Sequence, residues 1–132
     1  MSQHTFDYDR SYLPSAPVVE IVVNGYDAAV SSISCTTLVD SGADGTMHPV
    51  DLLNQLSAQF VGAKRMRGVT DHSTIVDMFV VQITIGEIVV DGIRAVGRSV
   101  GSECIIGRDI LNQLQVTLDG FALEVRVWDY ND

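Results

Sequence analysis

The chain has 132 residues, of which 46% are hydrophobic and 19% are charged, and its formal net charge is −9 at pH 7. This length suits one domain with a modest core, and the composition excludes a disordered chain. The acidic balance argues against nucleic acid or an anionic membrane as a partner, because both are bound by clustered lysine and arginine side chains.

No segment of the sequence has the character of a membrane anchor or an export signal. The apolar runs are all much shorter than the roughly 20 residues that span a bilayer. Residues 1–8 lack the basic and then apolar order of a signal peptide. We therefore expect a cytoplasmic protein.

Residues 1–16 are predicted to be an irregular N-terminal arm, and residues 17–132 a single domain. Residues 18–23 have the composition of a β-strand, and Asn24-Gly25 after them favours a hairpin turn. The chain then returns toward a second apolar run over residues 35–39, which is predicted to be a buried strand.

This second strand ends abruptly at Asp40-Ser41-Gly42-Ala43. Glycine permits backbone angles closed to other residues, so the chain can bend at Gly42 while the Asp40 carboxylate stays near backbone N–H groups and the Ser41 hydroxyl. Such a setting suits a carboxylate that takes part in chemistry. The same residues are also ordinary turn composition, in which the aspartate is a solvated cap.

The middle of the chain is predicted to contain one short helix and several strands. We expect the helix over residues 48–56, with Pro49 in its first turn. Residues 66–74 lie between two strand-like arms and have the character of a surface hairpin. Residues 75–85 carry apolar side chains on both faces, so we expect this strand to be covered on both sides.

Further turns are expected at Gly86-Glu87, Asp91-Gly92 and Asp119-Gly120, the last of them between two strands near the C-terminus. Neither Asp-Gly pair has a hydroxyl residue between its two members. Neither is therefore a second turn of the Asp40 kind, and one such carboxylate is identified per chain.

Three of the eight basic residues fall together at Lys64, Arg65 and Arg67. They are either a solvated strand face or a basic rim that selects acidic side chains of a substrate.

Cysteine and histidine indicate no metal site. Cys35 and Cys104 lack metal-type spacing and are too few for a disulfide framework, so we expect buried, reduced thiols. The three histidines are scattered in sequence and none is near either cysteine in sequence. We expect no metal and no cofactor.

A second motif stands far downstream of Asp40. The residues Cys104-Ile105-Ile106-Gly107-Arg108-Asp109 repeat the pattern of an apolar strand that ends at a glycine. Apolar side chains at Ile110, Leu111 and Leu114 then predict a short helix.

In this order, the two motifs resemble those of the retropepsin-like aspartic proteases, the family of the retroviral proteases and their cellular relatives. The similarity extends over roughly residues 17–128, and the two motifs are its sharp part. It implies a mainly β fold, a retropepsin-like acid-protease β-barrel with a short helix after the apolar-apolar-glycine motif.

The resemblance also assigns roles to residues. It implies that Asp40 is the catalytic acid and base, and that Asp44 and Arg108 form an ion pair that braces the turn. Ser41 stands where threonine is more frequent, but the hydroxyl is retained. The remaining supports implied for the catalytic turn are Ser41, Gly42, Ala43, Ile105, Ile106 and Gly107.

The hairpin of residues 66–74 corresponds by resemblance to the flap that closes over a bound peptide, with Gly68, Val69 and Thr70 at its substrate-binding tip. This tip is poorer in glycine than the retroviral flaps. Val69 and Ile106 are candidate pocket walls by position.

One such turn per chain implies a homodimer in which each subunit contributes Asp40 to one site, because two carboxylates that share a proton supply both an acid and a base. The function implied is that of an aspartic endopeptidase acting on polypeptides. One alternative is a retropepsin-like domain that binds peptides or dimerises without efficient cleavage. Another is an unrelated small β protein with chance matches, in which Asp40 would lie far from Gly107.

Overall fold

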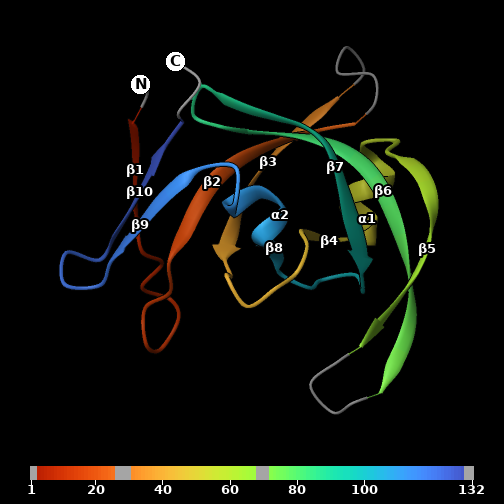
Figure 1. Cartoon of the computed structure of the whole chain (residues 1–132), viewed down its shortest axis with the longest axis horizontal. Coiled ribbons are helices and arrows are strands. Elements are labelled where there is room, and N and C mark those ends of the chain that lie inside the picture. Colours follow the sequence, from red (N-terminus) through yellow and green to blue (C-terminus); the bar gives the residue numbers. More distant parts are fainter. Residues whose placement is uncertain (1–2, 26–30, 68–71, 130–132) are drawn as a thin grey trace.

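A computed structural model describes residues 3–25, 31–67 and 72–129. Ten strands and two short helices lie in this part of the chain (Figure 1). In chain order they are β1 (Gln3–Asp7), β2 (Val18–Asn24), β3 (Ser32–Val39), β4 (Met47–Pro49), α1 (Val50–Gln55), β5 (Gln59–Arg67), β6 (Ser73–Ile85), β7 (Ile88–Arg98), β8 (Cys104–Ile106), α2 (Arg108–Leu111), β9 (Gln115–Asp119) and β10 (Glu124–Trp128).

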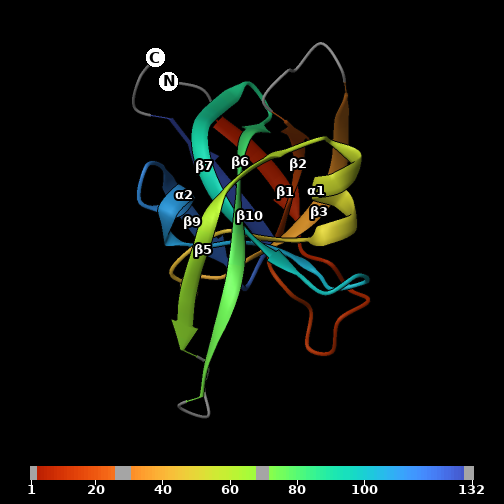
Figure 2. The same cartoon turned by 90° about the vertical axis from the view of Figure 1, so that its right-hand side faces the viewer.

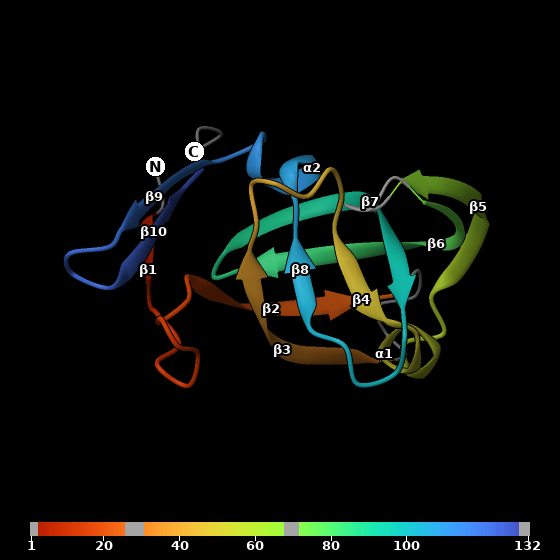
Figure 3. The ribbon, with the colours of Figure 1, turned by 90° about the horizontal axis from the view of Figure 1, so that it is seen from below.

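Seven strands form one sheet in the order β2-β3-β8-β4-β7-β6-β5, and β2 also pairs with β6. This extra pairing closes six of the strands into a barrel and leaves β5 outside it, along β6. Strands β3, β8, β4 and β7 lie side by side (Figure 3), with β3–β8 and β4–β7 parallel and β4–β8 antiparallel. The predicted mainly β barrel is confirmed, and neither helix is long or apolar enough to cross a membrane.

Alternate residues of the barrel strands fill its interior. On β2 these are Val19, Ile21 and Val23, and none of the three is more than 2% exposed. Leu53 of α1 and Ile110 of α2 are completely buried in the same core. Burial of one such side chain contributes about 1.5–3 kcal/mol, so this core is what holds the strand ends near Asp40 in place.

The second sheet has the order β1-β10-β9 and lies at one end of the barrel (Figure 1). Residues 3–7, which we expected to be irregular, pair with β10 from Gln3↔Trp128 to Asp7↔Glu124. Phe6 of this strand packs against the core. The prediction was wrong for β1 because the pairing partner lies at the other end of the chain, beyond the reach of any local pattern.

Two local predictions also fail. Asp91-Gly92 is a bulge within the continuous strand β7: the pairs Ile83↔Val90 and Val81↔Ile93 leave two residues of β7 opposite one of β6. Gly92 has a φ of +68°, which a glycine adopts without strain. Helix α1 begins at Val50, and Pro49 belongs to β4 rather than to the first helical turn.

Strand β6 is covered on one side only. Phe79, Val81, Ile83 and Ile85 are buried, whereas the side chains between them are only partly covered, and Ile75 is 71% exposed. Within the barrel alternate side chains of β6 face outward, and beyond it β6 and β5 project as a hairpin, which leaves Ile75 exposed (Figure 2). The apolar character of both faces of β6 therefore does not signal burial on both.

Candidate active site

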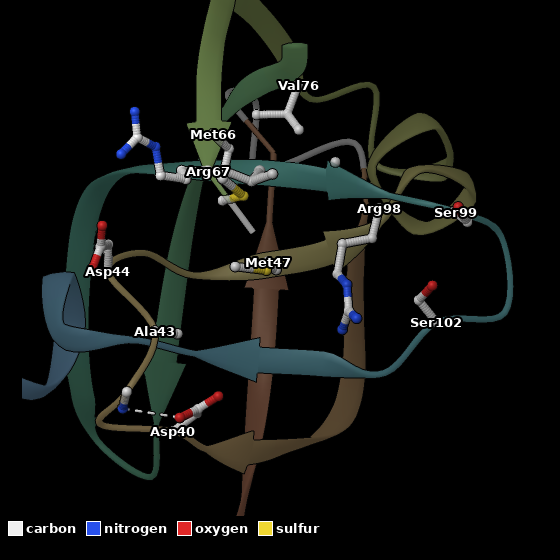
Figure 4. Close-up of a pocket in the computed structure, with 13 residues that line it drawn as sticks. Asp40, Ala43, Asp44, Met47, Met66, Arg67, Val76, Arg98, Ser99 and Ser102 are labelled. Carbon is white, nitrogen blue, oxygen red and sulfur yellow. Dashed lines mark hydrogen bonds between the residues drawn. The ribbon is translucent and has the colours of Figure 1, made fainter. Parts of the chain in front are cut away.

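Asp40 stands immediately after β3, in a turn held by three hydrogen bonds. Its backbone N–H donates to the carbonyl of Ile106 over 3.1 Å, and its carbonyl accepts from the N–H of Ala43 over 3.1 Å. Its Oδ1 accepts from the N–H of Gly42 over 2.9 Å (Figure 4). A Cβ at position 42 would lie 3.1 Å from Oδ1, so glycine gives the carboxylate room to approach the backbone.

The corner between β8 and α2 packs directly on this turn. A Cβ at Gly107 would lie 2.6 Å from the carbonyl oxygen of Gly45 and 2.8 Å from that of Ala43, so only glycine fits. The N–H of Arg108 donates to the same Ala43 carbonyl over 3.0 Å. The two motifs are therefore in contact, and the reading of a chance match with Asp40 remote from Gly107 is wrong.

Arg108 and Asp44 form an ion pair, and Nη1 of Arg108 also donates to the main-chain carbonyl of Ser41 over 2.7 Å. Both partners are at the surface, with side-chain exposures of 43% and 78%. Ser41 contributes its carbonyl oxygen to this contact. The arginine ties both sides of the turn together from outside.

A second set of hydrogen bonds, which neither sequence motif indicated, braces the same loop from inside. Thr46 is completely buried, and its hydroxyl donates to Oδ1 of Asp109 over 2.8 Å while its N–H donates to Oδ2 over 3.1 Å. The N–H of Gly107 approaches the same hydroxyl at 3.5 Å. The only signal was an aspartate in the first turn of the helix after the glycine.

A cleft of about 670 Å³ opens beside Asp40. Met47 of β4 and Val96 of β7 line it, and the β5–β6 hairpin contributes Met66, Arg67 and Val76 (Figure 4). The other lining residues are Asp40, Gly42, Ala43, Asp44, Gly97, Arg98, Ser99 and Ser102.

Of the residues predicted to contact substrate, the structure describes Ile106. Ile106 is 1% exposed and belongs to the core, so its assignment as a pocket wall was wrong; residues alternate along β8, and Ile106 faces inward. Gly68, Val69 and Thr70 lie outside the described residues.

The basic cluster on β5 is divided between sites. Arg67 lines the cleft, whereas Lys64 lines a second cavity of about 470 Å³. Arg65 donates to the hydroxyl of Ser73 over 3.4 Å at the surface. The three residues therefore do not form one rim, and Arg98, a cleft residue that the sequence analysis did not single out, lies on β7.

Cys104 is paired with Thr37 of β3, and His48 of β4 lies close to it. The Cys35 thiol lies close to Cys104, whose hydrogen bond raises the pKa of Cys35. The same contact lowers the pKa of Cys104, and His48 and Arg98 lower it further. Both cysteines are free, and His48, distant from Cys104 in sequence, is its neighbour in space.

Within the described residues, the ring nitrogens of His48 and the hydroxyl of Thr37 are buried without a hydrogen-bond partner.

Residues 3–25, 31–67 and 72–129 contain no group of three or more histidine, cysteine, aspartate or glutamate side chains placed to hold a metal ion.

Comparison of the sequence with known families finds no matching family model, and no curated protein matches it. The fold, in contrast, is similar to solved structures. One is a retropepsin-like aspartic protease from Rickettsia conorii, with a TM-score of 0.65, 10% identity, and coverage of 97% of this chain and 91% of the other.

A second similar structure is the EIAV protease complexed with the inhibitor HBY-793, with a TM-score of 0.56 and 20% identity. The match covers 74% of this chain and 86% of that protease. At these identities the similarity concerns the fold. The chain has the retropepsin-like aspartic protease fold. The features that agree with it are the barrel, the pairing of β8 with both β3 and β4, and the contact between the two motifs.

Proposed function

We propose that this protein is an aspartic endopeptidase, active as a homodimer in which each subunit supplies Asp40 to one catalytic site. The observation that carries the proposal is the setting of Asp40. Its carboxylate is held by the Gly42 N–H at the edge of a cleft with an apolar base, and the β8–α2 corner supports the turn. The fold shared with aspartic proteases supports the same reading.

A pair of such carboxylates can hydrolyse an amide without a cofactor. Two carboxylates at close range do not both ionise readily, so they share one proton. The ionised Asp40 takes a proton from a water molecule as the water attacks the scissile carbonyl, and the protonated Asp40 gives its proton to the carbonyl oxygen. Collapse of the resulting diol then returns one proton to a carboxylate and transfers another to the departing amine nitrogen.

The other residues of the two motifs act as positioning residues in this proposal. Ser41, Gly42 and Ala43 shape the turn, and Ile105 and Ile106 of β8 support it together with Gly107 at the β8–α2 corner. Asp44 and Arg108 brace its outer side.

The substrate is proposed to lie extended across the cleft, held by main-chain hydrogen bonds with alternate side chains in pockets. The β5–β6 hairpin is proposed as the flap. Met66, Arg67 and Val76 on its two arms line the cleft, and Gly68, Val69 and Thr70 would follow at its tip.

The test is cleavage of a diverse peptide library over a range of pH by wild type and by Asp40→Asn. We expect the substitution, which keeps the shape of the side chain, to reduce cleavage at least about 10³-fold. Sedimentation should show both proteins as dimers. A folded dimer that cuts nothing at any pH would favour the alternative of a peptide-binding or dimerisation domain.

Mixing the two proteins tests the shared site. If Asp40 from both subunits is needed, exchange with an equal amount of Asp40→Asn should lower the activity per wild-type chain to about half, because half of those chains then sit in mixed dimers. Activity per wild-type chain that does not change after exchange would contradict a site made of two subunits.

A further inference from the structure

The cleft contains a positively charged side chain that the catalytic proposal does not use. Arg98 is the last residue of β7 and is half-buried in the cleft wall. Its Nη1 donates to the main-chain carbonyl of Glu103 over 3.0 Å. In the described part of the chain no carboxylate forms an ion pair with Arg98.

The guanidinium group of Arg98 lies where a ligand in the cleft can reach it. Figure 4 shows the Arg98 guanidinium group across the cleft floor from Asp40, near the start of β8, with Met47 between Arg98 and the turn. Asp44, the other acidic residue of the cleft, is engaged by Arg108. The hydrogen bond to Glu103 holds the guanidinium group in place and leaves it further donors, since arginine carries five N–H groups.

The surroundings of Arg98 define the kind of side chain that would reach it. Met47, Met66, Val76 and Val96 form the apolar lining of the same cleft. A side chain entering over this surface gains by packing methylene groups against it and by ending in a negative charge at Arg98. Glutamate has this combination, whereas glutamine has the shape without the charge.

We propose that Arg98 is a specificity-determining residue that selects peptides with a glutamate side chain in the subsite over Met47. The inference deepens the proposed function, because it names the substrate class of the same cleft. It concerns binding selectivity as well as cleavage, so it can be tested even if the chain does not cut peptides.

Arg67 does not explain the same selectivity equally well. It lies on the projecting β5 arm and is exposed, so solvent and salt weaken its attraction for a substrate carboxylate. Arg98 is half-buried on a barrel strand, and a charge-assisted hydrogen bond there is stronger and has a fixed direction.

The experiment compares wild type, Arg98→Met, Arg98→Lys and Arg98→Glu on a random peptide library, with cleaved sequences read by mass spectrometry. Arg94→Met is the matched control, because Arg94 lies on the same strand, is exposed and does not line this cleft. Thermal unfolding of each variant checks that it folds. Peptides that differ only by glutamate, glutamine or lysine at the selected position then give kcat/KM ratios.

We expect wild type to prefer the glutamate peptide over the glutamine peptide about tenfold. Arg98→Met and Arg98→Glu should abolish this ratio, and Arg98→Glu should instead favour lysine at the position. Arg98→Lys should keep part of the preference, and Arg94→Met all of it. Equal cleavage of both peptides by wild type, or a preference that persists in Arg98→Met, would overturn the inference and leave the protease proposal intact.

A binding measurement separates the two proposals if no peptide is cut. The same library is passed over immobilised Asp40→Asn protein, with and without the added Arg98→Met change. Enrichment of glutamate peptides that depends on Arg98 would support the inference while the endopeptidase proposal fails. Retention without such enrichment, or no retention at all, would reject the inference.

Discussion

Arg108 and Asp109 are neighbours in the first turn of α2, and both brace the loop that follows Asp40, but they do so in different surroundings. Arg108 reaches Asp44 and the Ser41 carbonyl at the surface. Asp109 is half-buried and binds the hydroxyl and the N–H of Thr46, which is completely buried.

The difference between these two braces is one of solvation. An exposed ion pair gains little, because water already stabilises both charges and salt screens their attraction. At a partly buried carboxylate a lost donor is replaced less readily by water, so the loss of the hydrogen bond costs more than at the surface. The ion pair between Arg108 and Asp44, which the sequence motif indicates, is therefore expected to contribute less to stability than the hydrogen bonds between Thr46 and Asp109, which it does not.

The largest loss of stability is expected at Gly107, which packs against the loop after Asp40 with no space for a side chain. In Gly107→Ala the new Cβ would lie 2.6 Å from the carbonyl oxygen of Gly45 and 2.8 Å from that of Ala43, which are main-chain atoms. Relief requires moving the loop that Thr46 and Asp109 hold. We expect a loss of about 3 kcal/mol or more in the free energy of unfolding, measured by urea denaturation.

Gly120→Ala is the control for this substitution, because a Cβ at position 120 would meet nothing within 4 Å. Its stability should stay within about 0.5 kcal/mol of wild type. Equal stability of the two variants would show that the loop yields easily and that the interior brace is weak.

The next effect tests the buried brace directly. Thr46→Val keeps the shape of the side chain and removes the hydroxyl that donates to Asp109, so a partly buried carboxylate loses a partner. We expect a loss of about 1–3 kcal/mol in chemical denaturation. Thr36→Val is matched to it, since the Thr36 hydroxyl makes a similar bond of 2.6 Å to Glu20 at the surface, and its loss should be smaller.

A smaller effect is expected at the surface brace. Asp44→Asn removes the charge that faces Arg108, while the bond from Arg108 to the Ser41 carbonyl can persist. The loss should be at most about 1 kcal/mol and should shrink as salt is added. If Asp44→Asn costs more than Thr46→Val, the comparison between the two braces is wrong.

The smallest effect is expected at a second surface carboxylate, in the β9–β10 turn. Asp119 accepts from the Ala122 N–H over 2.9 Å and pairs with Arg126 over 3.1 Å, and these contacts lower the pKa of Asp119. A lowered pKa in the folded state means that the stabilisation is complete above the ordinary aspartate range and is lost as the pH falls through the folded-state pKa.

The measurement for Asp119 is unfolding of wild type and Asp119→Asn from neutral pH into acid. Wild type should be slightly more stable at neutral pH, and the two curves should converge at low pH. A difference that grows in acid would contradict the direction of the shift.

Local sequence patterns were sufficient for most of the strands, and the family resemblance implied the contact between the two motifs. The apolar runs before Asp40 and before Gly107 become β3 and β8. The turn after β3 and the corner after β8 are in contact, as the resemblance implied. Patterns failed where a distant partner decides the outcome. Residues 3–7 become a strand through β10, and Asp91-Gly92 becomes a bulge through β6.

The candidate site shows the same division. Asp40, Gly42 and Gly107 are recognisable because a bend that must pass close to other backbone has few alternatives to glycine. Arg98 and Thr46 are not recognisable, because nothing near them in sequence states that one lines the cleft and the other meets Asp109.

The sequence by itself determined the apolar strands, the two glycine turns and the single Asp40 of this chain, because these depend on side-chain periodicity and on backbone angles that act over a few residues. Only the tertiary structure decided which polar groups are buried together, which arginine lines the cleft, and that His48 lies beside Cys104. Burial and neighbouring charge depend on strands that meet from distant parts of the chain, and closure of the barrel is what brings them together.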